Sequence, residues 1–329
     1  MSDGIPCVRV PPTAGERTRT MLAEQGLIDT LYEIDTTEDY LYIPVVDSTA
    51  VPDQFDIVTH VVNIRDVPTS PADKLDFDPS YERLGEIIII DEDNHEKARE
   101  VAKAIVESDI PVKTVLNRDS KVSGPHRTRE WEVLAGEETE TCHREYGYTF
   151  RLDIESVYFS PRLATERHRV ITQVDAHDHV IDMFAGVGPF AVPMAARGAD
   201  VVAAELNENA VEYLSINAEQ NDVDDNFTIV SGDVRTLPDS YTDWADRLIM
   251  NLPHSADEFL ETAIRLAGDE CMIHYYDIQH EDTLYQPGIE AIRSAAEPNY
   301  KLTVETRHEV RSYAPHEYNI CLDVRLQRR

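Results

Sequence analysis

The residues best suited to chemistry lie between 179 and 191, where an apolar run ends in an acid and a glycine turn. Asp182 closes the apolar run, and Gly186 and Gly188 form a Gly-x-Gly turn. Glycine adopts backbone angles closed to other residues, so this turn lets the chain approach a ligand closely. Glu205 ends the next apolar run, where it is placed to bind both hydroxyls of a ribose. The spacing predicts a site for a nucleotide-type cofactor.

Pro189 narrows the choice of cofactor. Proline suits the first position of a helix, but it lacks the N–H group that a pyrophosphate would use there. S-adenosylmethionine carries no phosphate, and Asp182 is available to its amino group, so this methyl donor is the expected cofactor. A dehydrogenase is a disfavoured alternative, because Ala191 replaces the third glycine of a dinucleotide site. A third possibility is a tight glycine turn that binds no ligand, as doubly wound domains often contain.

A second candidate segment is Asn251-Leu252-Pro253-His254, which follows an apolar run from 245 to 250. The Asn251 amide has one acceptor and one donor group, so it can read the edge of a nucleobase. Pro253 restricts the loop and exposes neighbouring carbonyl groups. The alternative is that Asn-Leu-Pro forms an ordinary turn.

The elements that would position these residues alternate between strands and helices. Strands are predicted over 179–184, 200–206, 227–232, 246–251 and 270–278, with helices from 189 and over 208–220. Ser255 and Glu258 form a predicted capping box for a helix that Gly268 ends. The runs 301–310 and 318–326 follow each other without room for a helix, which predicts an antiparallel pair. We therefore expect an α/β fold with a mostly parallel seven-stranded sheet and an antiparallel edge, a layout that resembles class I methyltransferases.

Two small α+β domains are expected before this catalytic domain, which we place at 166–329. The first, 1–68, has a predicted helix over 14–25 and a strand over 40–46. The second, 70–165, has predicted strands over 86–90 and 112–116, a helix over 96–108 and a hairpin that turns at Tyr146-Gly147. Such modules position a large substrate or merely stabilise the fold, and we favour positioning.

The charge of the chain is strongly acidic. Its 63 acidic and 30 basic residues give a net charge of −33 over 329 residues, and the acids are spread throughout, as in proteins of halophiles. The stretch 111–129 reverses this balance with five basic residues against Asp119, and a second basic cluster spans 162–169. These clusters favour RNA binding, although they could also neutralise neighbouring acids. The five basic residues are Lys113, Arg118, Lys121, Arg127 and Arg129.

Other features of the sequence predict the cellular location of the protein and whether it contains disulfides or a metal. The sequence has no apolar run of about 18 residues and no signal peptide, so a cytosolic protein without a membrane partner is expected. The four cysteines are far apart and form no Cys-x-x-Cys pair, which fits neither a disulfide framework nor a structural zinc site. No metal is expected.

Four motifs together resemble the archaeal and eukaryotic tRNA (guanine-N1)-methyltransferases that act on position 37, beside the anticodon. The resemblance covers nearly the whole chain, and is weaker in the first domain, which is similar to the family's module that contacts the tRNA elbow. The motifs are Asp182-Met183-Phe184-Ala185-Gly186-Val187-Gly188-Pro189-Phe190, Asn251-Leu252-Pro253, Tyr158-Phe159-Ser160-Pro161-Arg162-Leu163-Ala164-Thr165-Glu166-Arg167 and Ile273-His274-Tyr275-Tyr276.

The resemblance implies a catalytic role for several residues. Guanine N1 is a poor nucleophile until a base removes its proton, and Glu166 matches the family's general base. Arg127 would stabilise the charge that develops on O6, with its neighbour Arg129 as the alternative residue and a simple phosphate contact as the alternative role of Arg127. Asn251 and Pro253 would complete the catalytic set. Tyr158 would pack against the donor or the base, or it belongs to the core as tyrosines in strands often do.

The resemblance also implies how donor and substrate bind. Glu205 stands where the family often has aspartate, but its longer side chain keeps the role plausible. The expected partner is a tRNA with guanosine at position 37, bound by a monomer, with no DNA partner, and the base must turn out of its loop. The residues expected around the donor are Asp182, Phe184, Gly186, Gly188, Glu205, Asp233, Asn251, Tyr158 and Arg167.

Two other functions remain open. The related enzyme of wyosine synthesis transfers the aminocarboxypropyl group of the same donor, although Glu166 and Asn251-Leu252-Pro253 favour methyl transfer. An RNA-binding protein with an inactive Rossmann unit is the second, and the intact glycines and acids of the turn argue against it.

Overall fold

The computed structural model describes residues 4–66, 68–120, 124 and 129–329, and it divides into two compact units, Met1–Thr69 and Ser70–Arg329. The first unit has a four-stranded sheet in the order β2-β3-β1-β4 and its own apolar core around Val8, Leu22 and Ile43. Its helix α1 confirms the helix predicted there. The elements are β1 (Ile5–Val10), α1 (Gly15–Glu24), β2 (Asp35–Thr36), β3 (Leu41–Pro44) and β4 (Asp56–His60).

The second unit begins with a four-stranded sheet in the order β5-β6-β7-β8, followed by a hairpin. Helix α2 is capped by the Asn94 side chain and packs its apolar face, including Val101 and Ile105, on this sheet. The hairpin turns at Tyr146 and Gly147, whose φ values of 48° and 93° are those of a type I′ turn, as expected. The elements are β5 (Tyr81–Leu84), β6 (Ile87–Ile90), α2 (His95–Val106), β7 (Thr114–Arg118), β8 (Trp131–Ala135), β9 (Glu140–Glu145) and β10 (Tyr148–Asp153).

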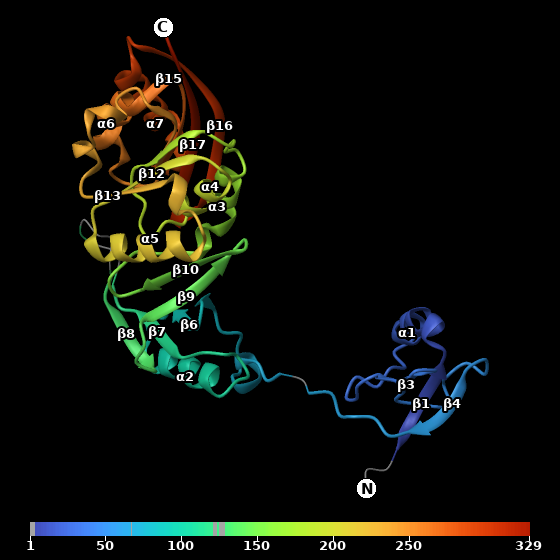
Figure 1. The fold of residues 1–329 in the computed structure, drawn as a ribbon. Coiled ribbons are helices and arrows are strands. Elements are labelled where there is room, and N and C mark those ends of the chain that lie inside the picture. Colours follow the sequence, from blue (N-terminus) through green and yellow to red (C-terminus); the bar gives the residue numbers. More distant parts are fainter. Residues whose placement is uncertain (1–3, 67, 121–123, 125–128) are drawn as a thin grey trace. The chain divides into compact units, whose positions relative to one another are not determined.

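The rest of the second unit is built on a seven-stranded sheet in the order β13-β12-β11-β14-β15-β17-β16 (Figure 1). The first five strands are parallel, and β17 is antiparallel to both of its neighbours, so the expected class I architecture is confirmed. The elements are α3 (Ala164–Ile171), β11 (His179–Asp182), α4 (Ala191–Ala196), β12 (Asp200–Glu205), α5 (Glu208–Gln220), β13 (Phe227–Ser231), β14 (Ala245–Met250), α6 (Leu260–Leu266), β15 (Ala267–His280), α7 (Gln286–Ala296), β16 (Tyr300–Ala314) and β17 (Glu317–Arg328).

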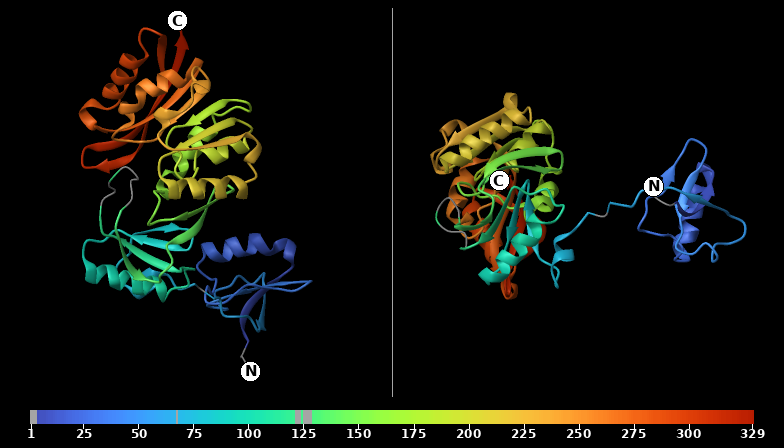
Figure 2. Two further views of the ribbon diagram at one scale, coloured as in Figure 1. Left: turned by 60° about the vertical axis from the view of Figure 1, so that its left-hand side comes forward. Right: turned by 90° about the horizontal axis from the view of Figure 1, so that it is seen from below.

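Helices cover both faces of this sheet (Figure 2). Alternate residues of each strand point to opposite faces, so Val180 joins the core under α3, α4 and α5, while Ile181 joins the core under α6 and α7. The first of these cores continues into the small sheet through Leu84 and Leu116. The four-stranded and seven-stranded sheets therefore share this core, while each also packs a core of its own on the other face.

Three local predictions need correction. Ser255 precedes a 3-10 turn (Ala256–Phe259), and within the described chain its side chain makes no capping bond, so the predicted capping box is wrong. Gly268 does not end the helix: it lies in β15, where an added Cβ would meet the Ala245 carbonyl oxygen at 3.3 Å. The regular helix begins at Ala191 rather than Pro189, because Pro193 has no N–H to bond back to residue 189.

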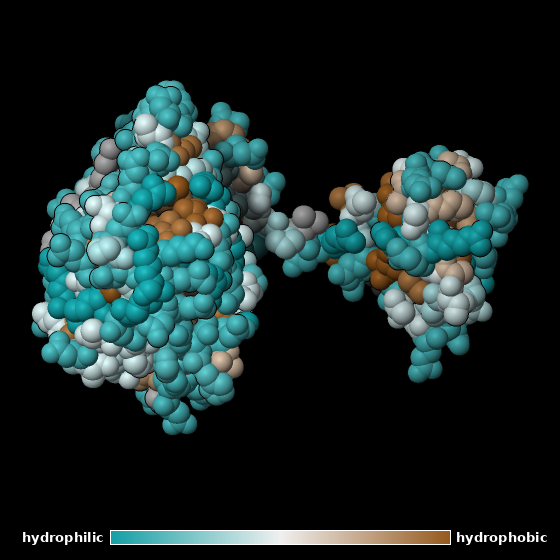
Figure 3. Space-filling model, turned by 90° about the horizontal axis from the view of Figure 1, so that it is seen from above, coloured by the Kyte–Doolittle hydropathy of each residue, from teal (hydrophilic) through white to brown (hydrophobic). Residues whose placement is uncertain are grey.

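The surface is mainly hydrophilic, as the face in Figure 3 shows. In the part of the chain that the structure describes, no helix has both the length and the apolar character needed to cross a membrane.

Candidate active site

The carboxyl group of Asp182 is buried at the end of β11 and is only half satisfied. Its Oδ1 accepts a hydrogen bond of 3.3 Å from the Phe184 N–H, whereas its Oδ2 has no partner among the described residues. Burial raises the pKa of Asp182 to about 7, an effect that the Phe184 N–H opposes and nearby Glu205 reinforces. A buried carboxylate oxygen without a donor fits a cationic ligand group, such as the amino group of S-adenosylmethionine.

Glu205 closes the turn from the neighbouring strand β12. Its Oε2 accepts from the Gly186 N–H and its Oε1 from the Asn207 N–H, both at 2.7 Å. These two bonds fix the carboxylate beside the glycine turn and leave further lone pairs on each oxygen. This arrangement fits the expected contact with a pair of ribose hydroxyls.

The two glycines of the turn serve different purposes. A Cβ on Gly186 would find only the Tyr158 carbonyl oxygen, 4.0 Å away, among the described residues, so the space beside Gly186 is open to a ligand. A Cβ on Gly188 would meet Leu214 at 2.7 Å and Val192 at 2.8 Å. Gly188 is thus required because helix α5 packs against the turn.

Aromatic contacts connect two more of the expected donor residues. The Phe184 ring packs edge-on against Phe259, with 4.9 Å between centroids, and the Arg235 guanidinium lies 4.8 Å from the centroid of Phe259. Arg235 also donates to both carboxylate oxygens of Asp233, which lowers the pKa of Asp233. The structure therefore links Phe184 to Asp233 through Phe259 and Arg235, and Asp233 already has a cationic partner.

Glu166 lies on α3 with only 4% of its side chain exposed. Its Oε1 accepts from the Tyr276 hydroxyl and from Arg169, each at 2.8 Å. Its Oε2 accepts from Arg169 Nε at 2.7 Å and lies 3.2 Å from His308 Nε2. These contacts compensate for the burial of the carboxylate and fix its orientation.

Tyr276 connects Glu166 to the two loops that the sequence singled out. Its ring centroid lies 6.0 Å from that of Phe190, which follows the glycine turn. In the parallel register of β14 and β15, Met250 pairs with Tyr275, so half-buried Asn251 and buried Pro253 follow at the same sheet edge. The glycine turn and the Asn251 loop therefore both follow the carboxyl ends of the parallel strands, the usual site of ligands in such sheets, and Tyr276 of the neighbouring strand β15 bonds Glu166.

A buried polar network behind Glu166 was not predicted. Arg169 donates to Asp323 at 2.5 Å, and the Asp323 carboxylate lies 2.7 Å from His274 Nδ1. Burial alone would raise the pKa of Asp323, but the bonds from His274 and Arg169 outweigh it and hold this pKa well below the usual value. Arg169 lies three residues after Glu166, on the same helix face, and this spacing was a usable signal.

Among the described residues, this network contains three side chains that are close enough together to bind a metal ion. Single ligand atoms of His274, Cys321 and Asp323 lie within 4.8 Å of one another. However, Arg247 lies 2.7 Å from His274 Nε2, and Arg169 occupies Asp323. Two guanidinium groups at this position disfavour a cation.

Arg167 and Tyr158 lie near the site with different surroundings. Arg167 is buried, donates to both oxygens of Glu145 and to the Ser160 carbonyl, and lies over the Phe159 ring. These contacts tie α3 to strand β9. The Tyr158 carbonyl oxygen faces Gly186, as described above.

The predicted basic cluster is partly neutralised. Arg127 and Lys121 lie outside the described residues. Lys113 pairs with Glu86 at 2.9 Å, and Arg118 pairs with Glu82 and Asp91. Countercharge therefore explains Lys113 and Arg118. Arg129 is different, because its guanidinium lies over the Trp131 ring at 5.3 Å.

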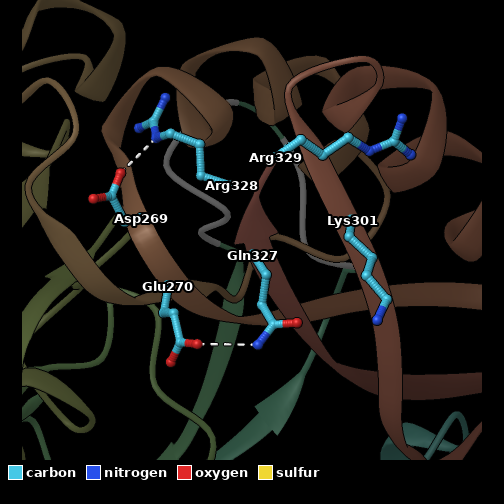
Figure 4. Close-up of a pocket in the computed structure, with 6 residues that line it drawn as sticks. All are labelled: Asp269, Glu270, Lys301, Gln327, Arg328 and Arg329. Atoms are coloured by element: carbon cyan, nitrogen blue, oxygen red, sulfur yellow. Dashed lines mark hydrogen bonds and ion pairs between the residues drawn. The ribbon is translucent and has the colours of Figure 1, made fainter.

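A shallow pocket of about 620 Å³ lies at the start of β15 and the end of β17 in the seven-stranded sheet (Figure 4). Its lining includes Lys301, and two cross-strand pairs close it, Arg328 with Asp269 and Gln327 with Glu270. These residues lie where β15 begins and β17 ends, so the pocket is separate from the candidate active site.

The fold and the site define an α/β, class I, S-adenosylmethionine-dependent methyltransferase. Comparison with known families identifies it further: residues 141–305 match the TRM5/TYW2 methyltransferase domain, and the chain belongs to this family. Residues 7–53 match the tRNA methyltransferase 5 N-terminal domain, and residues 69–139 match the TYW2 N-terminal domain.

Similar proteins align along most or all of the chain. A tRNA (guanine(37)-N(1))-methyltransferase, Trm5b of Pyrococcus abyssi, is 40% identical over 97% of this chain and 98% of its own length. A solved complex of aTrm5 with tRNALeu is 32% identical, with a TM-score of 0.75, over 98% of this chain and 99% of the other. A tRNA(Phe) (4-demethylwyosine(37)-C(7)) aminocarboxypropyltransferase of Methanocaldococcus jannaschii is 31% identical over 75% of this chain and 98% of its length.

Proposed function

We propose that this enzyme transfers a methyl group from S-adenosylmethionine to N1 of guanosine 37 in tRNA. The observation that carries the proposal is Glu166, a buried carboxylate oriented by Arg169 and by Tyr276, which follows the β15 residue that pairs with the end of β14. The similarity along nearly the whole chain to a tRNA (guanine(37)-N(1))-methyltransferase supports the same activity.

The donor is held by the residues of the turn. Asp182 Oδ2 receives its amino group, Glu205 its ribose, and Phe184 and Asp233 lie on the adenine side. When bound, the donor supplies an electrophilic methyl group. Arg167 supports this site indirectly, because Glu145 and Ser160 occupy its guanidinium.

Glu166 acts as the general base. Its Oε2, the oxygen beside His308, takes the N1 proton, which makes the ring nitrogen a better nucleophile toward the methyl group. Asn251 and Pro253 hold the edge of the base, and Arg127 or Arg129 offsets the charge that develops on O6. Turning the base out of its stacked loop costs a few kcal/mol, on the order of one unstacking step, which tRNA contacts elsewhere offset.

The N-terminal parts supply those contacts in this proposal. Residues 1–68 contact the tRNA away from the anticodon, 70–165 position the anticodon stem, and 166–329 carry out catalysis as a monomer that does not act on DNA. The match of 7–53 to the methyltransferase 5 N-terminal domain supports this assignment.

Aminocarboxypropyl transfer is the second candidate, because the family model covers enzymes of both kinds. Incubation of the purified chain with labelled donor, with tRNA transcripts that differ only at position 37 and with tRNA that carries 4-demethylwyosine there, separates the two by the acceptor and by the mass of the added group. We expect a methyl group on guanosine-37 transcripts alone. A larger adduct, or methylation independent of position 37, would refute the proposal.

Two variants test the assigned residues. Glu166→Gln and Asn251→Ala should lower methylation about 10²-fold or more, because they remove the base or its positioning, while donor affinity measured by calorimetry stays close to that of the parent. Glu155→Gln, an exposed glutamate nearby, is the matched control and should have full activity. Loss of donor affinity in the first two variants would mean that both residues are misplaced.

A further inference from the structure

A carboxylate base must lose its proton again before the next turnover, and Glu166 is poorly placed to do so alone. Only 4% of its side chain is exposed. Of the described groups that contact it, Arg169 cannot accept a proton. Tyr276 is buried, and burial raises its pKa well above the usual value, so it keeps its own proton.

His308 is the remaining contact, and it has a path to solvent. Its Nε2 lies 3.2 Å from Glu166 Oε2, and 40% of its side chain is exposed. It lies on β16, at the edge of the sheet, where it pairs with Cys321 of β17. Imidazole is the side chain suited to gaining and losing a proton near neutral pH.

We propose that His308 carries the proton from Glu166 to solvent after each methyl transfer. This inference rests on the proposed function. The N1–H bond breaks as an O–H bond forms on Glu166; that bond then breaks as an N–H bond forms at His308 Nε2, and the imidazolium releases a proton to water. Among the described residues, Glu166 contacts His308 directly. Arg169 and Tyr276 bond to Glu166, and Arg169 also bonds to Cys321 and Asp323 of β17.

The geometry also determines when this transfer occurs. Oε2 already accepts from Arg169 Nε at 2.7 Å, and His308 Nε2 lies 3.2 Å from it. The guanine N1–H must take the place of His308, so the exposed imidazole moves aside while the base is bound. It returns when the methylated tRNA leaves. The first turnover therefore does not need His308, but every later turnover does.

Rapid-mixing and steady-state methylation by the full chain test this sequence of events. In His308→Ala and His308→Gln, the rate of the first turnover should equal that of the parent, whereas the steady-state rate should fall about tenfold because proton release becomes slow. Added imidazole should restore His308→Ala, in proportion to its neutral form, but not His308→Gln, whose side chain fills the space. His316→Ala, an exposed histidine at the same hairpin, is the control and should not respond to imidazole.

The outcomes separate this inference from the proposed function. A full steady-state rate in His308→Gln would overturn it, since an amide cannot carry the proton. Equal loss in the first and later turnovers, or no effect of imidazole on His308→Ala, would also overturn it and assign His308 a structural role. An inactive parent chain would overturn the proposed function, and this inference with it.

Discussion

At the residue scale, Asp182 and Glu166 are both buried carboxylates with opposite surroundings. Glu166 has an arginine, a tyrosine hydroxyl and an imidazole around it. Asp182 has one long bond from a backbone N–H and an oxygen without a partner in the described chain. The hydrogen bonds of Glu166 are therefore complete before the substrate binds, whereas those of Asp182 are completed only by a cationic ligand.

This contrast predicts proton release when the donor binds. The pKa of Asp182 is raised to about 7, so near pH 6 its carboxyl group is mainly protonated in the free enzyme. The amino group of the donor favours the charged form and expels the proton. Calorimetry at about pH 6 in buffers of different ionisation enthalpy should detect this release, and donor affinity should rise with pH up to about 7. Asp182→Asn should show neither effect, and a parent chain without proton release would contradict the prediction.

The same shift predicts how stability changes with pH. Because the pKa is raised in the folded state, Asp182 costs nothing below the pKa of an unfolded aspartate, and the cost grows until the pH exceeds about 7. Above that pH, the charged Asp182 lowers the free energy of unfolding of the ligand-free enzyme by on the order of 4 kcal/mol. In urea unfolding, Asp182→Asn should gain stability over the parent between about pH 4 and pH 8. A constant difference across this range would exclude Asp182 as the source.

At the element scale, helix α5 supports both the glycine turn and strand β10 (Figure 1). The Asn217 side chain accepts from the Arg151 N–H at 2.7 Å and donates to the Val187 carbonyl at 2.9 Å. Asn221 bonds both backbone groups of Thr149. These amides satisfy an otherwise unpaired edge of β10 and connect it to the donor site.

Asn217→Ala should therefore destabilise the protein strongly. It leaves buried backbone groups on β10 and on the turn without partners, at a cost of about 3 kcal/mol. Chemical denaturation measures the change, and Asn209→Ala, an exposed asparagine on the same helix, is the matched control. A change below about 1 kcal/mol would mean that water replaces these bonds easily.

The two glycines of the turn should separate folding from binding. Gly186→Ala should lower the free energy of unfolding by only about 1–2 kcal/mol, because alanine disfavours the left-handed backbone of Gly186. It should weaken donor binding, because the added methyl group enters the open space that the donor would occupy. Gly188→Ala should cost about 3 kcal/mol or more, because its methyl group also collides with Leu214 and Val192. Unfolding curves and donor calorimetry of both variants test this, and equal effects on both measurements would contradict it.

At the scale of the whole molecule, self-repulsion should dominate the response to salt. A net charge of −33 destabilises a compact chain unless ions screen it. At about 1 M salt the screening length falls to roughly 3 Å, so the thermal midpoint should rise steeply with KCl. A neutral osmolyte at equal osmolality is the control and should stabilise less. A midpoint independent of KCl would show that local pairing, as at Lys113 and Arg118, already balances the charge.

The sequence by itself determined the order and type of most elements, because periodicity and turn chemistry are local properties. It also placed the glycine turn, Asp182, Glu205 and the Asn251 loop at the ends of strands, where they are the candidates for the site. The capping box predicted at Ser255 is wrong, because Ser255 precedes a 3-10 turn and its side chain makes no capping bond within the described chain.

Only the tertiary structure decided what surrounds Glu166. Tyr276 lies 110 residues away in the chain, and His308 and Asp323 lie on β16 and β17, whose pairing shifts register between Val304 and Thr306 and between Glu309 and Arg311. A shift of one residue turns each side chain to the other face, so no local pattern could place these partners. Gly188 illustrates the same limit, because its need for glycine comes from a helix that begins twenty residues later.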